Sequence, residues 1–148
     1  MIIDDMKLFT IGTRGTTAEE FFSRLVKSGA TALIDIRLRN TSQLAGWAKC
    51  DDLRYFTNSI CRIPYRHELK LAPTSRLLDD SRKPDRSWVS YEQEFRELIS
   101  QRRIEQLDKS SFDGACLLCA EAAPVHCHRR LVAEFLRDKW DNVEIVHL

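Results

Sequence analysis

The sequence predicts an α/β fold: a single domain, residues 1–148, with a mostly parallel sheet of about five strands and helices on both faces. Two observations carry this prediction. Short apolar runs alternate along the chain with longer segments whose apolar residues recur at helical spacing. The strand-like runs are apolar throughout, as expected for strands that helices cover on both sides. A chain of 148 residues is long enough to enclose one hydrophobic core.

The first third of the chain predicts a strand, a helix and a second strand. Residues 8–11 are a short apolar run that ends at Gly12. Residues 17–20 have the Thr-x-x-Glu spacing of a capping box, and Gly29 supplies a left-handed stop to the helix that follows. Residues 32–36 form a second apolar run. The apolar residues expected on the core face of the helix are Phe21, Phe22, Leu25 and Val26.

The middle of the chain carries weaker patterns. Residues 51–59 predict a short helix, and residues 61–65 a strand, with Pro64 at its end because proline cannot donate to a central ladder. The stretch from Pro73 to Pro84 predicts a long irregular loop, of the kind that often forms a functional lid.

The last third predicts two helices and two strands. A helix opens at Ser90 and places Phe95, Leu98 and Ile99 on one face. Residues 115–119 are the most strand-like run of the chain, residues 126–140 are helical, and residues 143–148 form the final strand. The core-facing residues expected on the last helix are Leu131, Val132, Phe135 and Leu136.

Composition excludes some classes of protein. The 23 Lys and Arg nearly cancel the 22 Asp and Glu, so no field of the whole molecule draws it to nucleic acid or a membrane. No apolar run approaches the roughly 20 residues of a bilayer span. The N-terminus lacks the layout of a signal peptide, which predicts a cytoplasmic protein. One basic segment is either a solvated loop or a local patch for nucleic acid: Arg62, Arg66, Lys70, Arg76, Arg82, Lys83 and Arg86.

Five cysteines are an odd number for a chain of this size. In a reducing compartment they predict core thiols, metal ligands or reactive thiols rather than disulfide partners. Cys50, Cys61 and Cys116 stand alone and are expected in the core. Cys119 and Cys127 lie close to other reactive residues and predict a functional site.

Reactive side chains follow the predicted strands where each strand ends. In an open parallel sheet, loops and helix N-termini converge at the carboxyl ends of the strands, where ligands bind. The residues expected to meet there as catalytic groups are Cys119, Glu121, Cys127 and His128, and as binding groups Gly12, Arg14, Asp35, Arg37, Tyr65 and Arg129. Arginines among them suit an anionic small molecule or a nucleotide-like group.

Three functions are open for this chain, two of them at this site. Cys119 precedes a helix start, whose positive end favours a thiolate, so it could serve as a nucleophile with Cys127 as a resolving or supporting thiol. Glu121 or His128 would then move the proton. Alternatively, Cys119, Cys127 and His128 could hold a metal ion, the one cofactor that we consider, such as zinc or iron. The third function is binding of nucleic acid by the basic segment.

Residues 119–129, with the sequence CAEAAPVHCHR, strongly resemble the signature Cys-Ala-Glu-x-x-Pro-x-x-Cys-His-Arg of the bacterial family called domain of unknown function 488. Residues 10–13, 34–37, 71–78 and 88–91 are also similar to that family, so the resemblance extends over nearly the whole chain. The chain departs from the family pattern in two places. Thr13 stands where the family usually has His, and residues 38–40 replace a turn rich in Pro and Ser. The resemblance implies an α/β fold with a shared site.

A fainter likeness links the chain to rhodanese-type domains. Their early part has a similar strand and helix followed by a segment like residues 34–37, and their catalytic Cys also ends a strand ahead of a helix. Their compact Cys-x5-Arg loop has no counterpart, because Arg129 lies ten residues after Cys119.

Overall fold

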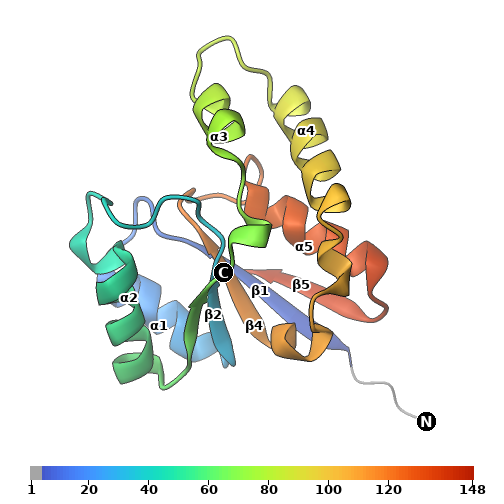
Figure 1. Ribbon diagram of the computed structural model, residues 1–148. Coiled ribbons are helices and arrows are strands. Elements are labelled where there is room, and N and C mark those ends of the chain that lie inside the picture. Colours follow the sequence, from blue (N-terminus) through green and yellow to red (C-terminus); the bar gives the residue numbers. More distant parts are fainter. Residues whose placement is uncertain (1–4) are drawn as a thin grey trace.

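One parallel five-stranded sheet forms the centre of the molecule (Figure 1). The computed structural model describes residues 5–148. The strands lie in the order β3-β2-β4-β1-β5, and every neighbouring pair is parallel. The predicted α/β class is therefore confirmed. The strands are β1 Met6–Gly12, β2 Ala32–Asp35, β3 Tyr65–His67, β4 Ala115–Cys119 and β5 Val143–His147.

Helices connect the strands, as crossovers between parallel strands require. The α-helices are α1 Ala18–Ser28, α2 Cys50–Phe56, α3 Ser75–Ser81, α4 Trp88–Gln101 and α5 His128–Lys139. A π-helical turn, η2 Thr57–Cys61, extends α2. The short 3-10 turns are η1 Gly46–Ala48, η3 Leu69–Leu71, η4 Ile104–Gln106 and η5 Lys109–Phe112.

Two hydrophobic clusters lie on opposite faces of the sheet. α1 and α2 cover one face with Phe21, Phe22 and Leu53, and α4 and α5 cover the other (Figure 1). Side chains of β4 alternate between them, because successive residues of a strand point to opposite faces. Cys116 and Leu118 therefore join the α1 cluster, whereas Ala115, Leu117 and Cys119 face α4 and α5.

The ends of α1 form as predicted. Thr17 accepts a hydrogen bond from the amide of Glu20, the Glu20 carboxylate accepts one from the Thr17 amide, and Gly29 closes the helix at φ 73°. Phe21, Phe22 and Leu25 are buried, but the placement of Val26 on the core face is wrong, since this residue is half exposed. It lies one position beyond Leu25, and the helical turn carries it past the edge of the apolar face.

The middle of the chain differs from the prediction in three places. The strand expected at residues 61–65 is wrong, because η2 continues to Cys61 and β3 begins only at Tyr65. The stretch expected to be irregular contains α3, which starts because the Thr74 side chain caps the amide of Leu77 and Leu77 is buried. α4 begins at Trp88 rather than at Ser90, since Ser87 is its N-cap.

The last third agrees closely with the prediction. β4 occupies residues Ala115–Cys119 as expected, and β5 begins at Val143. α5 starts two residues later than predicted, at His128, with Cys127 as its N-cap. The bend that precedes α5 brings the beginning of this helix back to the end of β4.

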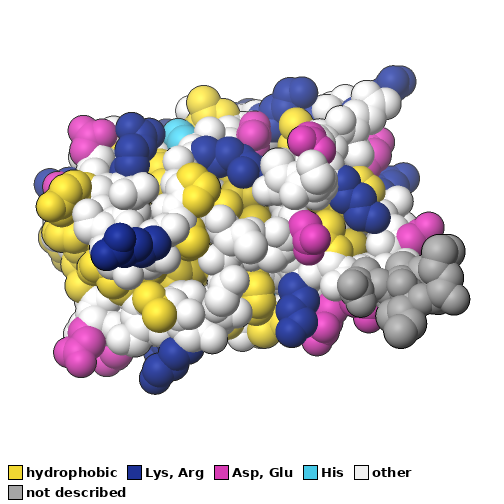
Figure 2. Space-filling view, turned by 90° about the horizontal axis from the view of Figure 1, so that it is seen from below, with side chains coloured by type: hydrophobic (Ala, Val, Ile, Leu, Met, Phe, Trp, Pro, Cys, Tyr) yellow, Lys and Arg dark blue, Asp and Glu magenta, His cyan; other side chains and the backbone are white. Residues whose placement is uncertain are grey.

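Charges of both signs are interspersed on the face that Figure 2 shows. Apolar side chains lie between them on the face seen there. Among residues 5–148, none of the helices has the length and apolar character to cross a membrane.

Gly12 closes β1 opposite Cys119 of β4 and makes room for the loop after β4. A Cβ atom at this position would overlap the carbonyl oxygen of Glu121 and lie 2.6 Å from Nη1 of Arg129. We expect Gly12→Ala to lower the free energy of unfolding by about 2 kcal/mol or more, because backbone atoms must move. Urea denaturation measures this change in the free energy of unfolding. Gly46→Ala is the matched control, since a Cβ there meets nothing within 4 Å; an equal loss in both variants would contradict this account.

Candidate functional site

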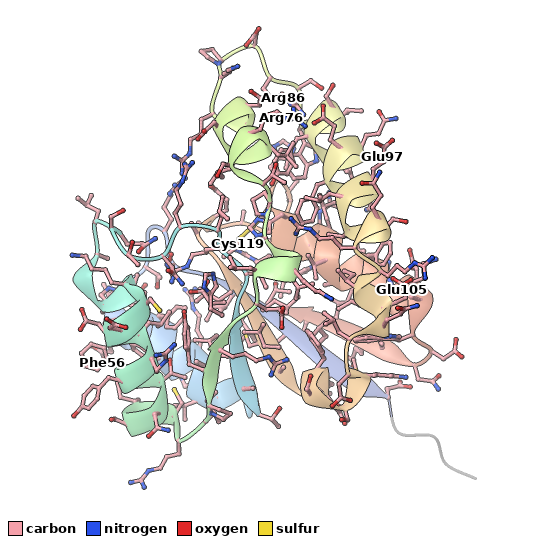
Figure 3. All side chains as sticks on the ribbon, in the orientation of Figure 1. Phe56, Arg76, Arg86, Glu97, Glu105 and Cys119 are labelled. Atoms are coloured by element: carbon pink, nitrogen blue, oxygen red, sulfur yellow. A yellow bond between two sulfur atoms is a disulfide. The ribbon has the colours of Figure 1, made fainter. Side chains whose placement is uncertain are left out.

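A cleft of about 1120 Å³ opens at the carboxyl end of the sheet. Its walls come from the loops after β1, β2 and β4, from the start of α5, and from the arm that α3 and α4 form above the sheet (Figure 1). Figure 3 shows Cys119 below this arm, with Arg86 far above it near the ends of α3 and α4. A space of this size accommodates a small-molecule ligand.

Two sulfur atoms lie at the floor of the cleft. Cys119 ends β4 and Cys127 caps α5, and the two residues form a disulfide with their Cα atoms 7.6 Å apart. Both side chains are almost buried, 1% and 2% exposed, yet both border the cleft. The prediction that the cysteines are not disulfide partners is wrong for this pair, because the bend before α5 returns the chain to the end of β4.

The other three cysteines are free, and their surroundings differ. Cys116 is buried within the α1 cluster, as predicted, and burial raises the pKa of its thiol well above the ordinary value. Cys50 and Cys61 are only half-buried, so the core placement is wrong for them. Both belong to the α2–η2 segment at the rim of the sheet, where helices have one solvated side.

His128 lies beside the two sulfurs, and its tautomer and charge follow from its contacts. Its Nε2 lies 2.8 Å from the carbonyl oxygen of Ile36. Because a carbonyl can only accept, Nε2 carries the hydrogen and Nδ1 keeps a free lone pair. Burial lowers the pKa of His128 to about 4, although the bond to Ile36 opposes this change, so the ring is neutral at pH 7. Ligand atoms of Cys119, Cys127 and His128 all lie within 4.8 Å of one another.

Arg129 ties the loop after β4 to the sheet. Its fully buried guanidinium donates to the carbonyl oxygens of Glu121 and Ala122 and, from Nε, to Oγ1 of Thr10 at 3.3 Å. Nη1 also lies 3.7 Å from Sγ of Cys119. Arg129 therefore positions the loop and adds a positive charge beside the sulfur.

Asp35 anchors a second buried network behind the cleft. Its carboxylate accepts from Nε and Nη2 of Arg37 at 2.9 and 2.8 Å, from the Tyr65 hydroxyl at 2.6 Å and from the Asn40 amide at 3.2 Å. Burial alone would raise the pKa of Asp35, but the hydrogen bonds and charge of Arg37 and the bond from Tyr65 hold it below 3.8. Burial and Asp35 in turn raise the pKa of Tyr65. Asp35 thus stays ionised and holds Arg37 in place.

The predicted site residues divide into two groups. Those that line the cleft are Arg14, Arg37, Cys119, Glu121, Cys127 and His128. Those that lie behind its wall and support it are Gly12, Asp35, Tyr65 and Arg129. Arg14 and Glu121 form an exposed ion pair at 3.0 Å across the rim. The roles predicted for these residues stay predictions.

Sequence reasoning missed much of the outer wall of the cleft. Trp88 of α4 stacks on Tyr91 and His126, with ring centroids 5.2 and 4.9 Å apart, and all three rings line the cleft. Three arginines of this wall were not assigned to the site: Arg39, and Arg82 and Arg86, which were predicted only as members of the basic segment. The lid predicted for residues 73–84 and the stretches that resemble the family at residues 71–78 and 88–91 pointed to this wall, but only tertiary structure places the arm over the cleft.

The basic segment of the middle chain does not form one surface. Arg82 and Arg86 line the cleft, whereas Arg66 does not and lies over the ring of Phe112 in η5. Arg76 is paired with Asp80 and Glu94. Contact of this segment with nucleic acid stays a prediction.

Comparison with known proteins identifies the family. Residues 17–136 match the family described as Domain of unknown function DUF488. The chain belongs to the DUF488 family. The matched range begins at the N-cap of α1 and ends within α5, so it includes Cys119, Cys127 and His128. No curated protein and no solved structure matches the chain. The likeness to rhodanese-type domains stays a prediction.

The buried pair of Asp35 and Arg37 predicts a large effect of Asp35→Asn. The variant leaves a buried guanidinium unpaired, so we expect the free energy of unfolding to fall by about 3–5 kcal/mol. Because the pKa of Asp35 is lowered in the folded state, this stabilisation is present above pH 3.8 and disappears as the pH falls through the folded pKa. Urea denaturation across pH 2–7 measures both effects.

Asp79→Asn is the control for this prediction, since Asp79 forms an exposed ion pair with Arg39. We expect a much smaller change there, because exposed pairs contribute little. A loss for Asp35→Asn that is equally small, or that grows as the pH falls, would contradict the assignment.

Proposed function

We propose that the protein is a cytoplasmic, cysteine-dependent enzyme that acts on a small anionic molecule or a nucleotide-like group. The observation that carries the proposal is the contact of two sulfurs, Cys119 and Cys127, at the floor of an arginine-lined cleft. Disulfides of cytosolic proteins are usually transient and catalytic, which favours a reactive pair over a structural one.

The surroundings of Cys119 favour a thiolate in the reduced protein. Nη1 of Arg129 lies 3.7 Å from its sulfur. Cys127 is the N-cap of the 12-residue helix α5, so the positive end of this helix also points at the sulfurs. The free Nδ1 of His128, or the carboxylate of Glu121 at the rim, is available to accept the thiol proton.

A two-step reaction accounts for the pairing of the sulfurs. The Cys119 thiolate attacks an electrophilic sulfur of an anionic substrate, displaces the leaving group with its electron pair, and forms a mixed disulfide. The Cys127 thiolate then attacks the Cys119 sulfur and releases the rest of the substrate as a thiolate. Two electrons pass from the dithiol to the substrate, and an external thiol reduces the resulting Cys119–Cys127 disulfide.

The cleft suits an anionic substrate. Its lining contains five arginines, Arg14, Arg37, Arg39, Arg82 and Arg86, and one acidic residue, Glu121. An excess of one charge in a recessed space concentrates ligands of the opposite charge. The stacked rings of Trp88, Tyr91 and His126 offer an apolar wall for a flat group, as in a nucleotide-like molecule.

An anionic aromatic disulfide, 5,5′-dithiobis(2-nitrobenzoate), tests this reaction in the reduced protein. Cys50→Ser/Cys61→Ser serves as the parent, which removes the half-buried free thiols. We expect the parent to release two thionitrobenzoate anions per active chain, the added Cys127→Ser variant to release one and keep the mixed disulfide, and the added Cys119→Ser variant to react about tenfold more slowly.

Absorbance gives the rate, and mass spectrometry gives the adduct. Apart from Cys119 and Cys127, the residues of the cleft are the same in all three proteins. Differences in rate or adduct among them therefore show the contribution of each of the two sulfurs. A parent that reacts no faster than free glutathione at pH 7, or a Cys119→Ser variant that reacts as fast as the parent, would exclude Cys119 as the nucleophile.

A second function, metal binding, is favoured by the same three ligands. Sγ of Cys119 and Cys127 and a ring nitrogen of His128 lie within 4.8 Å of one another. The bond from Nε2 of His128 to the Ile36 carbonyl fixes the ring as such bonds do for metal ligands, with Nδ1 free to coordinate. Two thiolates and one imidazole would hold zinc and leave its fourth position open to the cleft.

Zinc content after reduction tests the second function. We expect about one zinc per chain in reduced protein, and loss of the metal in Cys119→Ser and in His128→Ala, because each removes one of three ligands. Elemental analysis of untagged protein measures it, with Cys61→Ser as the control that retains the metal. Less than about 0.2 zinc per chain would exclude this function.

A further inference from the structure

Arg37 has a hydrogen-bond donor that no group of the described chain uses. Its Nε and Nη2 hold Asp35, while Nη1 is buried without a partner among residues 5–148. The side chain is only 4% exposed, and leaving a buried donor unsatisfied is costly. Nε and Nη2 form the edge of the guanidinium that faces Asp35, so Nη1 lies on the other side. Arg37 borders the cleft, whereas Asp35 does not, so the edge of the guanidinium that carries Nη1 is the one left for a ligand.

The first turn of α5 presents further donors beside Arg37. Its N-cap, Cys127, makes no side-chain hydrogen bond to the helix, and the Cys127 carbonyl accepts the amide of Arg130, so the uncapped amides are those of His128 and Arg129. The ring of His128 in this turn is bonded to the carbonyl of Ile36, the residue directly before Arg37. The uncapped amides and the unused guanidinium nitrogen therefore belong to one corner of the cleft, next to the sulfurs.

Further arginines line the rest of the cleft. Arg14, Arg39 and Arg86 line the cleft while pairing with Glu121, Asp79 and Glu94. The pairs of Arg14 and Arg39 are largely exposed and hence weak, so both side chains can turn to a ligand at little cost. Arg82 lines the cleft and takes part in no ion pair within the described range 5–148.

We infer that the cleft binds the phosphate group of a small molecule, with Nη1 of Arg37 and the first amides of α5 as its donors. Guanidinium groups and helix N-termini both bind phosphate in proteins, and a tetrahedral dianion can accept from both at once. This inference rests on the proposed function and names its substrate class: a phosphate ester whose reacting group reaches Cys119.

Isothermal titration calorimetry tests the phosphate site separately from the thiol chemistry. The protein is Cys119→Ser/Cys127→Ser, which cannot react, and it is compared with the wild type. The probes are inorganic phosphate, adenosine monophosphate, adenosine and acetate. We expect the two phosphates to bind at millimolar concentration or below, more weakly as salt rises, and adenosine and acetate not to bind.

Two variants test the residues. Arg37→Lys keeps a charge beside Asp35 but lacks Nη1, and we expect it to weaken phosphate binding about tenfold or more. Arg82 is exposed, so Arg82→Ala leaves the buried network intact. We expect this variant to weaken phosphate binding by a smaller factor than Arg37→Lys does. Arg24→Ala in α1 is the control outside the cleft and should leave affinity unchanged. Circular dichroism checks folding of each variant.

The outcomes separate this inference from the proposed function. No phosphate binding at 10 mM, equal binding of acetate, or affinity unchanged in both Arg37→Lys and Arg82→Ala would overturn the phosphate site. If Cys119 still reacts as expected with the aromatic disulfide, the proposed function stands without it. If phosphate binds but Cys119 is inert, the inferred site stands and the thiol enzyme falls.

Discussion

The site depends on one constraint: the start of α5 must return to the end of β4, and a buried Arg129 enforces this. A guanidinium is expensive to bury unless its N–H groups find acceptors. Here they donate to the carbonyl oxygens of Glu121 and Ala122 and to the Thr10 hydroxyl. The bend between β4 and α5 is thereby held against β1. Because Cys119 and Cys127 stand at the two ends of that bend, the network that stabilises the loop also brings the sulfurs together.

Asp35 and Arg37 form a second buried network that fixes the loop after β2, as Arg129 fixes the loop after β4. Their buried ion pair is completed by Tyr65 from β3, so β2 and the edge strand β3 share one polar cluster. Such a cluster contributes little net stability against an apolar core, but it fixes geometry. In this protein it leaves Nη1 of Arg37 without a partner among residues 5–148. The two networks meet at the bond between His128 and the Ile36 carbonyl.

The same three residues support two kinds of chemistry. Reduced Cys119 and Cys127 can exchange electrons with a substrate or, with His128, coordinate a metal ion. A sulfur that is bound to a metal is not free to attack a substrate, and a sulfur in a disulfide cannot act as a thiolate ligand. Both require deprotonated sulfur, which the charge of Arg129 and the positive end of α5 favour. The donors of the inferred phosphate site come from Arg37 and the helix backbone, so they are independent of the state of the sulfurs.

The sequence alone determined what local patterns encode: the apolar run of β4, the Thr17–Glu20 capping box, and the concentration of Cys119, Glu121, Cys127 and His128 between a strand and a helix. Each depends on neighbours within a few residues, so periodicity and spacing reveal it. Tertiary structure alone decided that Cys119 and Cys127 are joined in a disulfide, that Arg129 is used internally, and that α3 and α4 bring Arg82, Arg86 and Trp88 to the cleft. Cys119 and Cys127 are only eight residues apart, but the bend between them is held by the contact of Arg129 with Thr10 of β1, and the arm of α3 and α4 meets residues that are likewise remote in sequence. These positions follow from the packing of helices on a sheet rather than from any local sequence pattern.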